Sequence, residues 1–280
     1  MDHLRDPIFI LSSARSGSTL LRYIVDTHPA ICCPPELNLG SVCEGLYWAA
    51  YDTVARVANV STDDARADVA SAEVRRVVSG LMETYKTAKG KQIWCEKTPK
   101  NLLYHEVLST IFPDARFLCL YRNCLDVVHS CIEFCQHTPM TELDPYFQKY
   151  PDDQITAMIG YWTDRAIMLL DCERFNPGRC FRIKYEDLVA QPAEALEPMF
   201  KFLGVSWDPR LLDSVFTEPH DEGDGDPKIS KARTINQNSV GAGSAISVDR
   251  VPHDLLKQTN FILEQLGYPA VETFSAEAIH

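Results

Sequence analysis

The feature that most limits the fold of this chain is the segment PIFILSSARSGSTLLRYIVDTHP, residues 7–29. Apolar residues 8–13 predict a buried strand, and the amphipathic pattern over 18–28 predicts a helix. The turn between them, ARSGS, places unpaired backbone N–H groups and the positive end of the helix dipole together, which favours a bound anion. Gly17 allows close backbone approach, and three hydroxyls can add donors, those of Ser16, Ser18 and Thr19. An ordinary tight strand–helix turn is the alternative interpretation.

The loop lacks the lysine of the Walker pattern G-x-x-x-x-G-K-[ST]. No lysine is placed to bridge β- and γ-phosphates, and no Ser/Thr–Asp pair is arranged for magnesium. Arg15 stands in the loop instead, and its planar guanidinium suits a bridging oxyanion. A small-molecule kinase, which would bind a nucleoside triphosphate with magnesium, therefore becomes an alternative rather than the first hypothesis.

Alternation of short apolar runs with helical patterns predicts an α/β fold with a central parallel sheet flanked by helices. Further strands are expected at 92–97, 116–122 and 180–186. Thr98 and Pro99 follow the second strand as a helix cap and a first helical residue. Helices are expected at 41–58, 64–88, 100–110, 123–135, 153–175, 192–203, 208–216 and 252–266.

We expect one domain over 1–280, in which the polar segment 217–249 is the least regular part. It could be a flexible linker or a loop that covers the active site, and we favour the covering loop because long loops in compact domains are often functional. Its acidic run, EPHDEGDGD, is expected to be solvated.

Composition narrows the function classes. The net charge of −12 argues against a protein that coats nucleic acid, and no apolar run approaches a membrane span. The N-terminus is too acidic for a signal peptide, so the ten cysteines are interpreted as reduced thiols of a cytoplasmic protein. Cys124, Cys131 and Cys135, with His129 and His137 nearby, match no zinc spacing and fall on one helix face. No metal is expected.

A second anion site is predicted from RFLCLYRNCLDVVHS. Arg122 ends a strand and Ser130 follows eight residues later on the next helix, so both can flank one pocket at the carboxyl edge of the sheet. Such a pair suits a second, separate phosphate. Taken singly, Arg122 could be a surface ion-pair partner and Ser130 an ordinary helix residue.

These segments resemble those of sulfotransferases that use 3′-phosphoadenosine-5′-phosphosulfate (PAPS). ARSGSTLL resembles their 5′-phosphosulfate loop, and YRNCLDVVHS resembles their 3′-phosphate segment. The similarity continues through PPELNLG, CEKTPKN, KYEDLVAQPAEALEPMFKFLGV and GDPKISKARTINQNSVG, and is with tyrosylprotein sulfotransferases and the sulfotransferase domains of polyketide synthases. It implies a P-loop-NTPase-like sulfotransferase fold.

The resemblance also implies roles for individual residues. Tyr185 would line the adenosine site and Lys97 would stabilise the transferring sulfuryl group. Arg122 and Ser130 would hold the 3′-phosphate. The 5′-phosphosulfate would be bound by Arg15, Ser16, Gly17, Ser18, Thr19 and Leu20, and a segment near 230–241 would close over the nucleotide with Ser230, Thr234 and Ser239 as its candidate contacts.

The acceptor hydroxyl should lose a proton during transfer, which calls for a general base. Glu36 is our candidate, and it resembles the acidic base of the tyrosylprotein enzymes, although a solvated loop carboxylate is the alternative. The polyketide-synthase domains typically carry a histidine where this chain has Asn38. A histidine from elsewhere could therefore serve instead, and the alternatives are His28, His105 and His137.

The predicted function is in-line transfer of a sulfuryl group from PAPS to a hydroxyl of a small-molecule or carrier-bound acceptor, with Arg15 and Lys97 acting without a metal. Sulfation of a peptide tyrosine, a non-catalytic nucleotide-binding protein on the same fold, and the kinase remain alternatives. The aromatic residues Tyr47, Trp48 and Tyr51 could line the acceptor pocket or pack beneath it.

Overall fold

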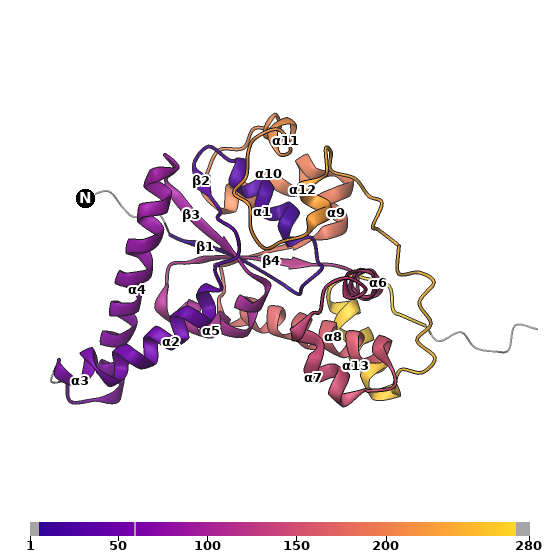
Figure 1. Ribbon diagram of the computed structural model, residues 1–280, viewed down its shortest axis with the longest axis horizontal. Coiled ribbons are helices and arrows are strands. Elements are labelled where there is room, and N and C mark those ends of the chain that lie inside the picture. The colour runs from indigo at the N-terminus through magenta and orange to yellow at the C-terminus, as the bar shows by residue number, and fades with distance from the viewer. Residues whose placement is uncertain (1–5, 59, 273–280) are drawn as a thin grey trace, which may run out of the picture.

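A five-stranded parallel sheet lies at the centre of residues 6–58 and 60–272, the part of the chain that the computed structural model describes (Figure 1). The strand order is β2-β3-β1-β4-β5. The strands are β1 (Ile8–Ser12), β2 (Ile31–Cys32), β3 (Ile93–Lys97), β4 (Arg116–Tyr121) and β5 (Cys180–Lys184). The predicted α/β fold with a parallel sheet is confirmed. The sequence reading missed β2, because two residues are too few to show a pattern.

Helices cover both faces of the sheet, and they bury β1, β2 and β3 completely, whereas the edge strand β5 is only partly buried. In β1, Phe9 and Leu11 belong to one core, and Ile8 and Ile10 belong to the other. Figure 1 shows α1, α10 and α11 above the sheet and α2, α5, α8 and α13 below it. The first core receives α2 (Leu39–Asp52), α4 (Asp63–Ala88), α5 (His105–Ile111), α6 (Cys124–Cys135), α8 (Gln154–Phe175) and α13 (His253–Gln265), and the second receives α1 (Ser18–Thr27), α9 (Tyr185–Ala190), α10 (Pro192–Phe202) and α11 (Leu211–Ser214).

Several boundaries differ from the sequence prediction. The helix expected at 41–58 breaks at Thr53 into α2 and α3 (Val54–Val57). The strand expected to end at 186 stops at Lys184, because Tyr185 begins α9, whose first turn carries acidic residues that favour a helix N-terminus. The helix expected at 208–216 is reduced to α11. Short elements that were not predicted are η2 (Thr141–Leu143), α7 (Asp144–Lys149) and α12 (Pro227–Ser230).

The segment after β3 also differs in detail. Thr98 precedes Pro99 as expected, but the first turns form the 3₁₀ helix η1 (Pro99–Tyr104), and α5 begins at His105. The Thr98 side chain does not cap this helix; it donates to Glu96 instead.

The topology places a crevice beside β1. This strand lies between β3 and β4, so the chain passes to opposite sides of β1 at the carboxyl edge of the sheet. In open parallel sheets ligands bind at such a switch point. No helix in the described part of the chain has both the length and the apolar character needed to cross a membrane.

Candidate active site

A cavity of about 590 Å³ lies at the carboxyl edge of the sheet, where the loop after β1 leads into α1. Helix α1 starts at Ser18, as predicted, with Gly17 as its N-terminal flanking residue. Ala14, Ser18, Thr19 and Leu20 line this cavity. Ser16 does not line it; its side chain is buried, and its hydroxyl lies 2.6 Å from that of Ser13. The start of the helix therefore faces the cavity, while Ser16 is buried beneath the loop and forms a hydrogen bond with Ser13.

Gly17 is required by its backbone conformation and by its neighbour. Its φ is 90°, in the left-handed region that favours glycine. A Cβ atom at this position would lie 2.4 Å from Cδ2 of the Tyr185 ring, closer than any real contact. The absence of a side chain thus lets the Tyr185 ring close against the loop.

Arg122 follows β4 and is held by backbone carbonyls. Its Nη1 donates to the oxygen of Arg15 at 2.9 Å, its Nη2 donates to the oxygen of Ser239 at 2.8 Å, and its Cζ lies 4.4 Å from the centre of the Tyr185 ring. Its Nε is buried and has no hydrogen-bond partner among the residues that the structure describes. Arg122 lines the cavity, and a guanidinium fixed in this way is suited to an oxyanion there.

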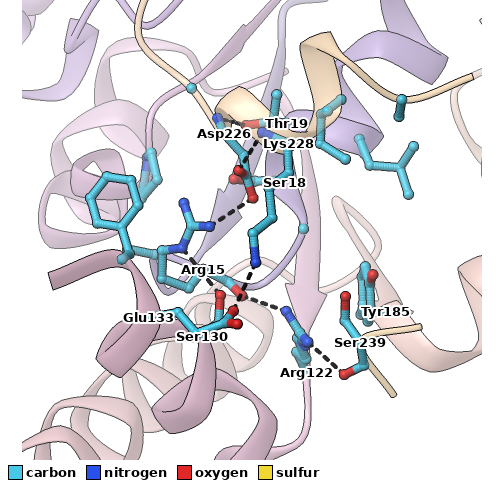
Figure 2. Close-up of a pocket in the computed structure, with 18 of the residues that line it drawn as sticks. Arg15, Ser18, Thr19, Arg122, Ser130, Glu133, Tyr185, Asp226, Lys228 and Ser239 are labelled. Carbon is cyan, nitrogen blue, oxygen red and sulfur yellow. Dashed lines mark hydrogen bonds and ion pairs between the residues drawn. The ribbon is translucent and has the colours of Figure 1, made fainter. Parts of the chain in front are cut away.

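Arg15 takes a position different from the expected one. Its Nε donates to the Ser130 hydroxyl at 3.3 Å, its Nη2 lies 2.7 Å from the Asp226 carboxylate, and its guanidinium lies over the Phe134 ring (Figure 2). The sequence predicted separate sites for Arg15 and for Ser130, but the structure brings them together. In this position the Arg15 guanidinium is paired with the Asp226 carboxylate, an anion supplied by the chain itself.

The segment 217–249 lies over the side of the cavity that is formed by the predicted phosphate loop, which comprises residues 13–20, from the end of β1 through the first turn of α1. The backbone N–H of Asp226 donates to Thr19 at 3.0 Å, and Lys228 pairs with Glu133 on α6. Further along, the Asp126 carboxylate accepts the N–H groups of Gly241 and Gly243, each at 2.8 Å. Residues of this segment that line the cavity include Asp224, Gly225, Asp226, Lys228, Thr234 and Ser239. Ser230 is exposed, does not line the cavity, and donates to Pro227 within α12.

The acidic run in this segment was expected to be solvated, and that expectation was wrong for three of its members. Asp221 accepts from Tyr85 and pairs with Lys89, and His220 lies 2.7 Å from Asp26. Asp226 pairs with Arg15, as described above. These contacts anchor the start of the segment to α1 and α4.

Glu36 and Lys97 form an ion pair at the other end of the same cavity. Lys97, the last residue of β3, has a side chain only 1% exposed, whereas that of Glu36 is 19% exposed. Glu36 lines the cavity together with Asn38, Pro99 and Lys100. Lys97 is not among the described residues that line the cavity, so it lies behind Glu36, and the cavity joins the loop after β1, Arg122 and the Glu36 carboxylate.

Glu96, Thr98 and Asn101 hold the backbone that carries Glu36, and the sequence reading did not single them out as site residues. The Glu96 carboxylate accepts the N–H of residue 37 at 3.0 Å, and the Thr98 hydroxyl accepts the N–H of Asn38 at 3.1 Å. Burial raises the pKa of Glu96, and hydrogen bonds from Thr98, the residue 37 N–H and Asn101 oppose this shift. The sequence pattern that could have identified these residues is the polar segment EKTPKN, which begins with the last two residues of the buried strand β3.

Asn38 also lines the cavity. Its φ is 54°, a left-handed conformation that asparagine tolerates better than most residues, and it flanks the start of α2. Another cavity residue, Glu142, was also missed; its Oε1 is buried and has no hydrogen-bond partner among the described residues, and burial raises its pKa.

The alternative bases lie elsewhere. His28 is buried beneath Phe200, with Nε2 2.9 Å from the Ser206 oxygen, and neither His105 nor His137 is among the described residues that line the cavity. Three aromatic residues of α2 contact one another and do not line this cavity: Tyr47, Trp48 and Tyr51. Cys124, Cys131 and Cys135 lie on α6, as the helix pattern predicted.

Comparison with known proteins agrees with the resemblance to sulfotransferases that the sequence showed. The model of a family described as the sulfotransferase family matches residues 7–209. A protein-tyrosine sulfotransferase 2 from Gallus gallus is 25% identical over 272 residues, covering 93% of this chain and 69% of its own. A putative protein-tyrosine sulfotransferase from Caenorhabditis briggsae is 26% identical over 206 residues, covering 73% and 68%.

Among solved structures, the sulfotransferase domain from the curacin biosynthetic pathway superimposes with a TM-score of 0.68 at 24% identity, covering 96% of this chain and 100% of that domain. A mouse sulfotransferase complexed with PAP gives a TM-score of 0.53 at 15% identity, covering 92% of this chain and 86% of that one. These likenesses show a shared fold. The family match spans more than half of the 280 residues, and the chain belongs to the sulfotransferase family.

Proposed function

We propose that this sulfotransferase takes its sulfuryl group from PAPS and transfers it to a hydroxyl of a small-molecule or carrier-bound acceptor. The observation that carries the proposal is one cavity lined by the start of α1, by Arg122 and by Glu36, whose carboxylate is paired with the buried Lys97. The cavity volume of about 590 Å³ is in the range of small-ligand sites.

The donor would place its two phosphate-bearing ends on these groups. The 5′-phosphosulfate would lie at the N–H groups that open α1, and the 3′-phosphate would lie against the Arg122 guanidinium and the Ser130 hydroxyl. The structure of the mouse relative complexed with PAP supports an adenosine nucleotide of this kind. Arg15 would exchange the Asp226 carboxylate for the anionic donor, because both are negative partners for one guanidinium.

The chemistry is an in-line displacement at sulfur. The acceptor oxygen forms a bond to sulfur, and the bond from sulfur to the bridging oxygen breaks. The leaving group is 3′-phosphoadenosine-5′-phosphate (PAP), which keeps that oxygen. Glu36 would accept the acceptor proton, and the Lys97 ammonium would donate to a sulfuryl oxygen as negative charge develops. The direct contact between Glu36 and Lys97 supports a shared role for the two groups.

Incubation of the purified protein with donor labelled in its sulfuryl group tests this proposal. The acceptor panel should contain simple phenols and alcohols, a hydroxyacyl carrier protein and a tyrosine peptide. Transfer to a small or carrier-bound hydroxyl supports it. Failure of PAP to bind in calorimetry would reject the donor, and transfer of phosphate from magnesium ATP would favour the kinase. PAP binding without transfer to any acceptor would favour a non-catalytic protein.

Sulfation of a peptide tyrosine is the second candidate. It is favoured by the names of the relatives, which are protein-tyrosine sulfotransferases, and by an acidic base candidate at Glu36. Preferential labelling of the tyrosine peptide over a free phenol of the same concentration would select this function.

A further inference from the structure

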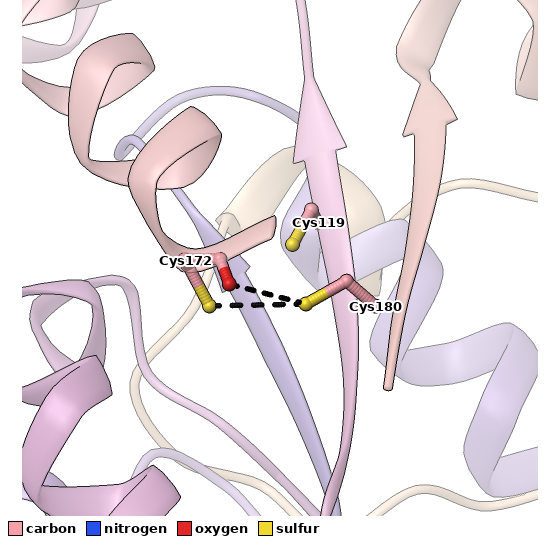
Figure 3. A group of neighbouring side chains, drawn as sticks. All are labelled: Cys119, Cys172 and Cys180. Carbon is pink, nitrogen blue, oxygen red and sulfur yellow. Dashed lines mark hydrogen bonds between the residues drawn. The ribbon is translucent and has the colours of Figure 1, made fainter. Parts of the chain in front are cut away.

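Three cysteine thiols meet away from the cavity, on the face of the sheet that α8 covers (Figure 3). They are Cys119 in β4, Cys172 in α8 and Cys180 at the start of β5. Their sulfur atoms all lie within 4.8 Å of one another, and the Sγ atoms of Cys172 and Cys180 are 4.0 Å apart. Among the described residues this is the one group of three or more side chains with the spacing of a metal site.

We infer that these three thiols form a binding site for one soft d¹⁰ cation, of the class of Zn²⁺ or Cu⁺. Thiolate ligands select such ions. With metal–sulfur bonds of about 2.3 Å, ligands in tetrahedral or trigonal positions lie about 3.8–4.0 Å apart. The 4.0 Å separation between Cys172 and Cys180 matches this spacing without movement of the backbone.

The surroundings supply partners for thiolates. Asn176 donates from Nδ2 to the Cys172 sulfur at 3.7 Å and to the Cys172 carbonyl at 2.8 Å. The Asn176 oxygen is held in turn by Arg179, and Ser109 also donates to it. Such contacts orient a ligand and help to compensate negative charge on sulfur.

A basic side chain is also close. Arg179 precedes Cys180 in the chain, and both Arg179 and His105 lie near enough to Cys180 to interact with its thiol electrostatically. His105 is buried, but it does not belong to the group of ligand atoms that lie within 4.8 Å of one another among the described residues. Three thiolates alone suit a trigonal ion, and a tetrahedral ion would need a fourth ligand from outside this group.

Dense packing alone would be the simpler reason for buried cysteines, since a free cysteine behaves as a small apolar residue. Cys33 and Cys95 illustrate that case, because their thiols contact each other in the opposite core but belong to no group of three ligands among the described residues. The group at Cys119 differs by its third sulfur and by the amide donor on Cys172.

The test uses tag-free, full-length protein that has been reduced and stripped with a chelator. It is titrated with Zn²⁺ and Cd²⁺, and with Cu⁺ under anaerobic conditions. The expected result is one ion per chain after gel filtration, a thiolate-to-metal charge-transfer band with Cd²⁺ or Cu⁺, and a higher melting temperature. Cys119→Ser and Cys172→Ser should lose the band. Cys95→Ser should keep it, because Cys95 is likewise a fully buried residue of a central strand.

A wild-type circular dichroism spectrum and a cooperative melting transition report that each variant is folded, and Cys180→Ser serves as a further variant because this residue is partly exposed. Metal binding that survives in folded Cys180→Ser and Cys172→Ser would overturn the inference, as would the absence of any retained ion in the wild-type protein. A Cys172–Cys180 disulfide, found by peptide mapping without bound metal, would also overturn it. None of these readouts depends on sulfuryl transfer, so the inference and the proposed function fail separately.

Discussion

Lys97 donates to the carboxylate of Glu36 across 61 positions of sequence, and the ammonium that makes this contact is almost fully buried. A buried ammonium needs a charged partner, because burial without one is costly. Glu36 supplies it while still lining the cavity. The pair therefore joins a carboxylate that faces the cavity to a buried positive charge, and the proposed mechanism uses the first as proton acceptor and the second as donor to a sulfuryl oxygen.

Glu36→Gln should abolish turnover and leave nucleotide binding intact. Loss of a general base lowers the rate by about 100- to 10,000-fold, whereas the phosphate loop and Arg122 are untouched. Turnover with labelled donor and PAP affinity by calorimetry measure the two effects. Glu133→Gln is the control, since Glu133 lines the same cavity but forms an exposed ion pair with Lys228. Equal turnover in Glu36→Gln and wild type would place the base elsewhere.

Gly17→Ala should abolish PAP binding. The new Cβ would lie 2.4 Å from the Tyr185 ring at a φ of 90°, so the loop must move or the ring must leave. Calorimetry and thermal denaturation measure the loss. Gly80→Ala in α4 is the matched control, because nothing lies within 4 Å of its Cβ and alanine in a helix should stabilise it by about 0.5–1 kcal/mol. Wild-type PAP affinity in Gly17→Ala would contradict the proposed contact.

Arg122→Lys should weaken PAP binding by about 10- to 100-fold, the cost of one charge-assisted hydrogen bond. Lysine cannot hold two backbone carbonyls and still present an N–H from a fixed plane. Adenosine 5′-phosphate, which lacks the 3′-phosphate, should lose far less affinity. Calorimetry with both nucleotides separates the two cases. An equal loss for both would show that Arg122 supports the loop rather than a 3′-phosphate.

Asp226→Asn should tighten PAP binding by about threefold to tenfold. The Asp226 carboxylate and an anionic ligand compete for Arg15, and a partly exposed ion pair is worth about 1 kcal/mol. Asparagine can still accept the N–H of Lys228 that caps α12, so the segment keeps its local structure. Asp224→Asn, on the same segment and lining the same cavity, is the control. Weaker binding in Asp226→Asn would mean that the carboxylate helps the segment to close.

His28 should make the fold less stable below about pH 6.5. Burial lowers its pKa from 6.5, and its Nδ1 accepts the N–H of Ala30, so the folded protein holds the ring neutral. As pH falls from 6.5 towards the folded-state pKa, the unfolded chain binds a proton that the folded chain does not, so the free energy of unfolding decreases by up to about 1.4 kcal/mol per pH unit. Urea denaturation at several pH values should show a shallower slope for His28→Gln. An unchanged slope would assign the pH dependence to other groups.

Local patterns were enough to predict most of the architecture. The apolar runs at 8–13, 92–97, 116–122 and 180–186 contain the strands, because they are short, rich in residues that favour β-strands, and bounded by polar turns. The phosphate loop was equally visible, since a strand, a glycine and a helix follow one another within the segment 7–29. β2 escaped because two residues carry no periodicity.

The sequence by itself determined the parallel sheet, the loop at Gly17 and the candidate roles of Arg122, Glu36 and Lys97, because each depends on neighbours in the chain or on a resemblance of short segments. Tertiary structure alone decided that Arg15 pairs with Asp226, 211 positions away, and that Cys119 meets Cys172 and Cys180. Charge and sulfur contacts of this kind depend on which elements the sheet brings side by side, and a one-dimensional pattern carries no information about that distance.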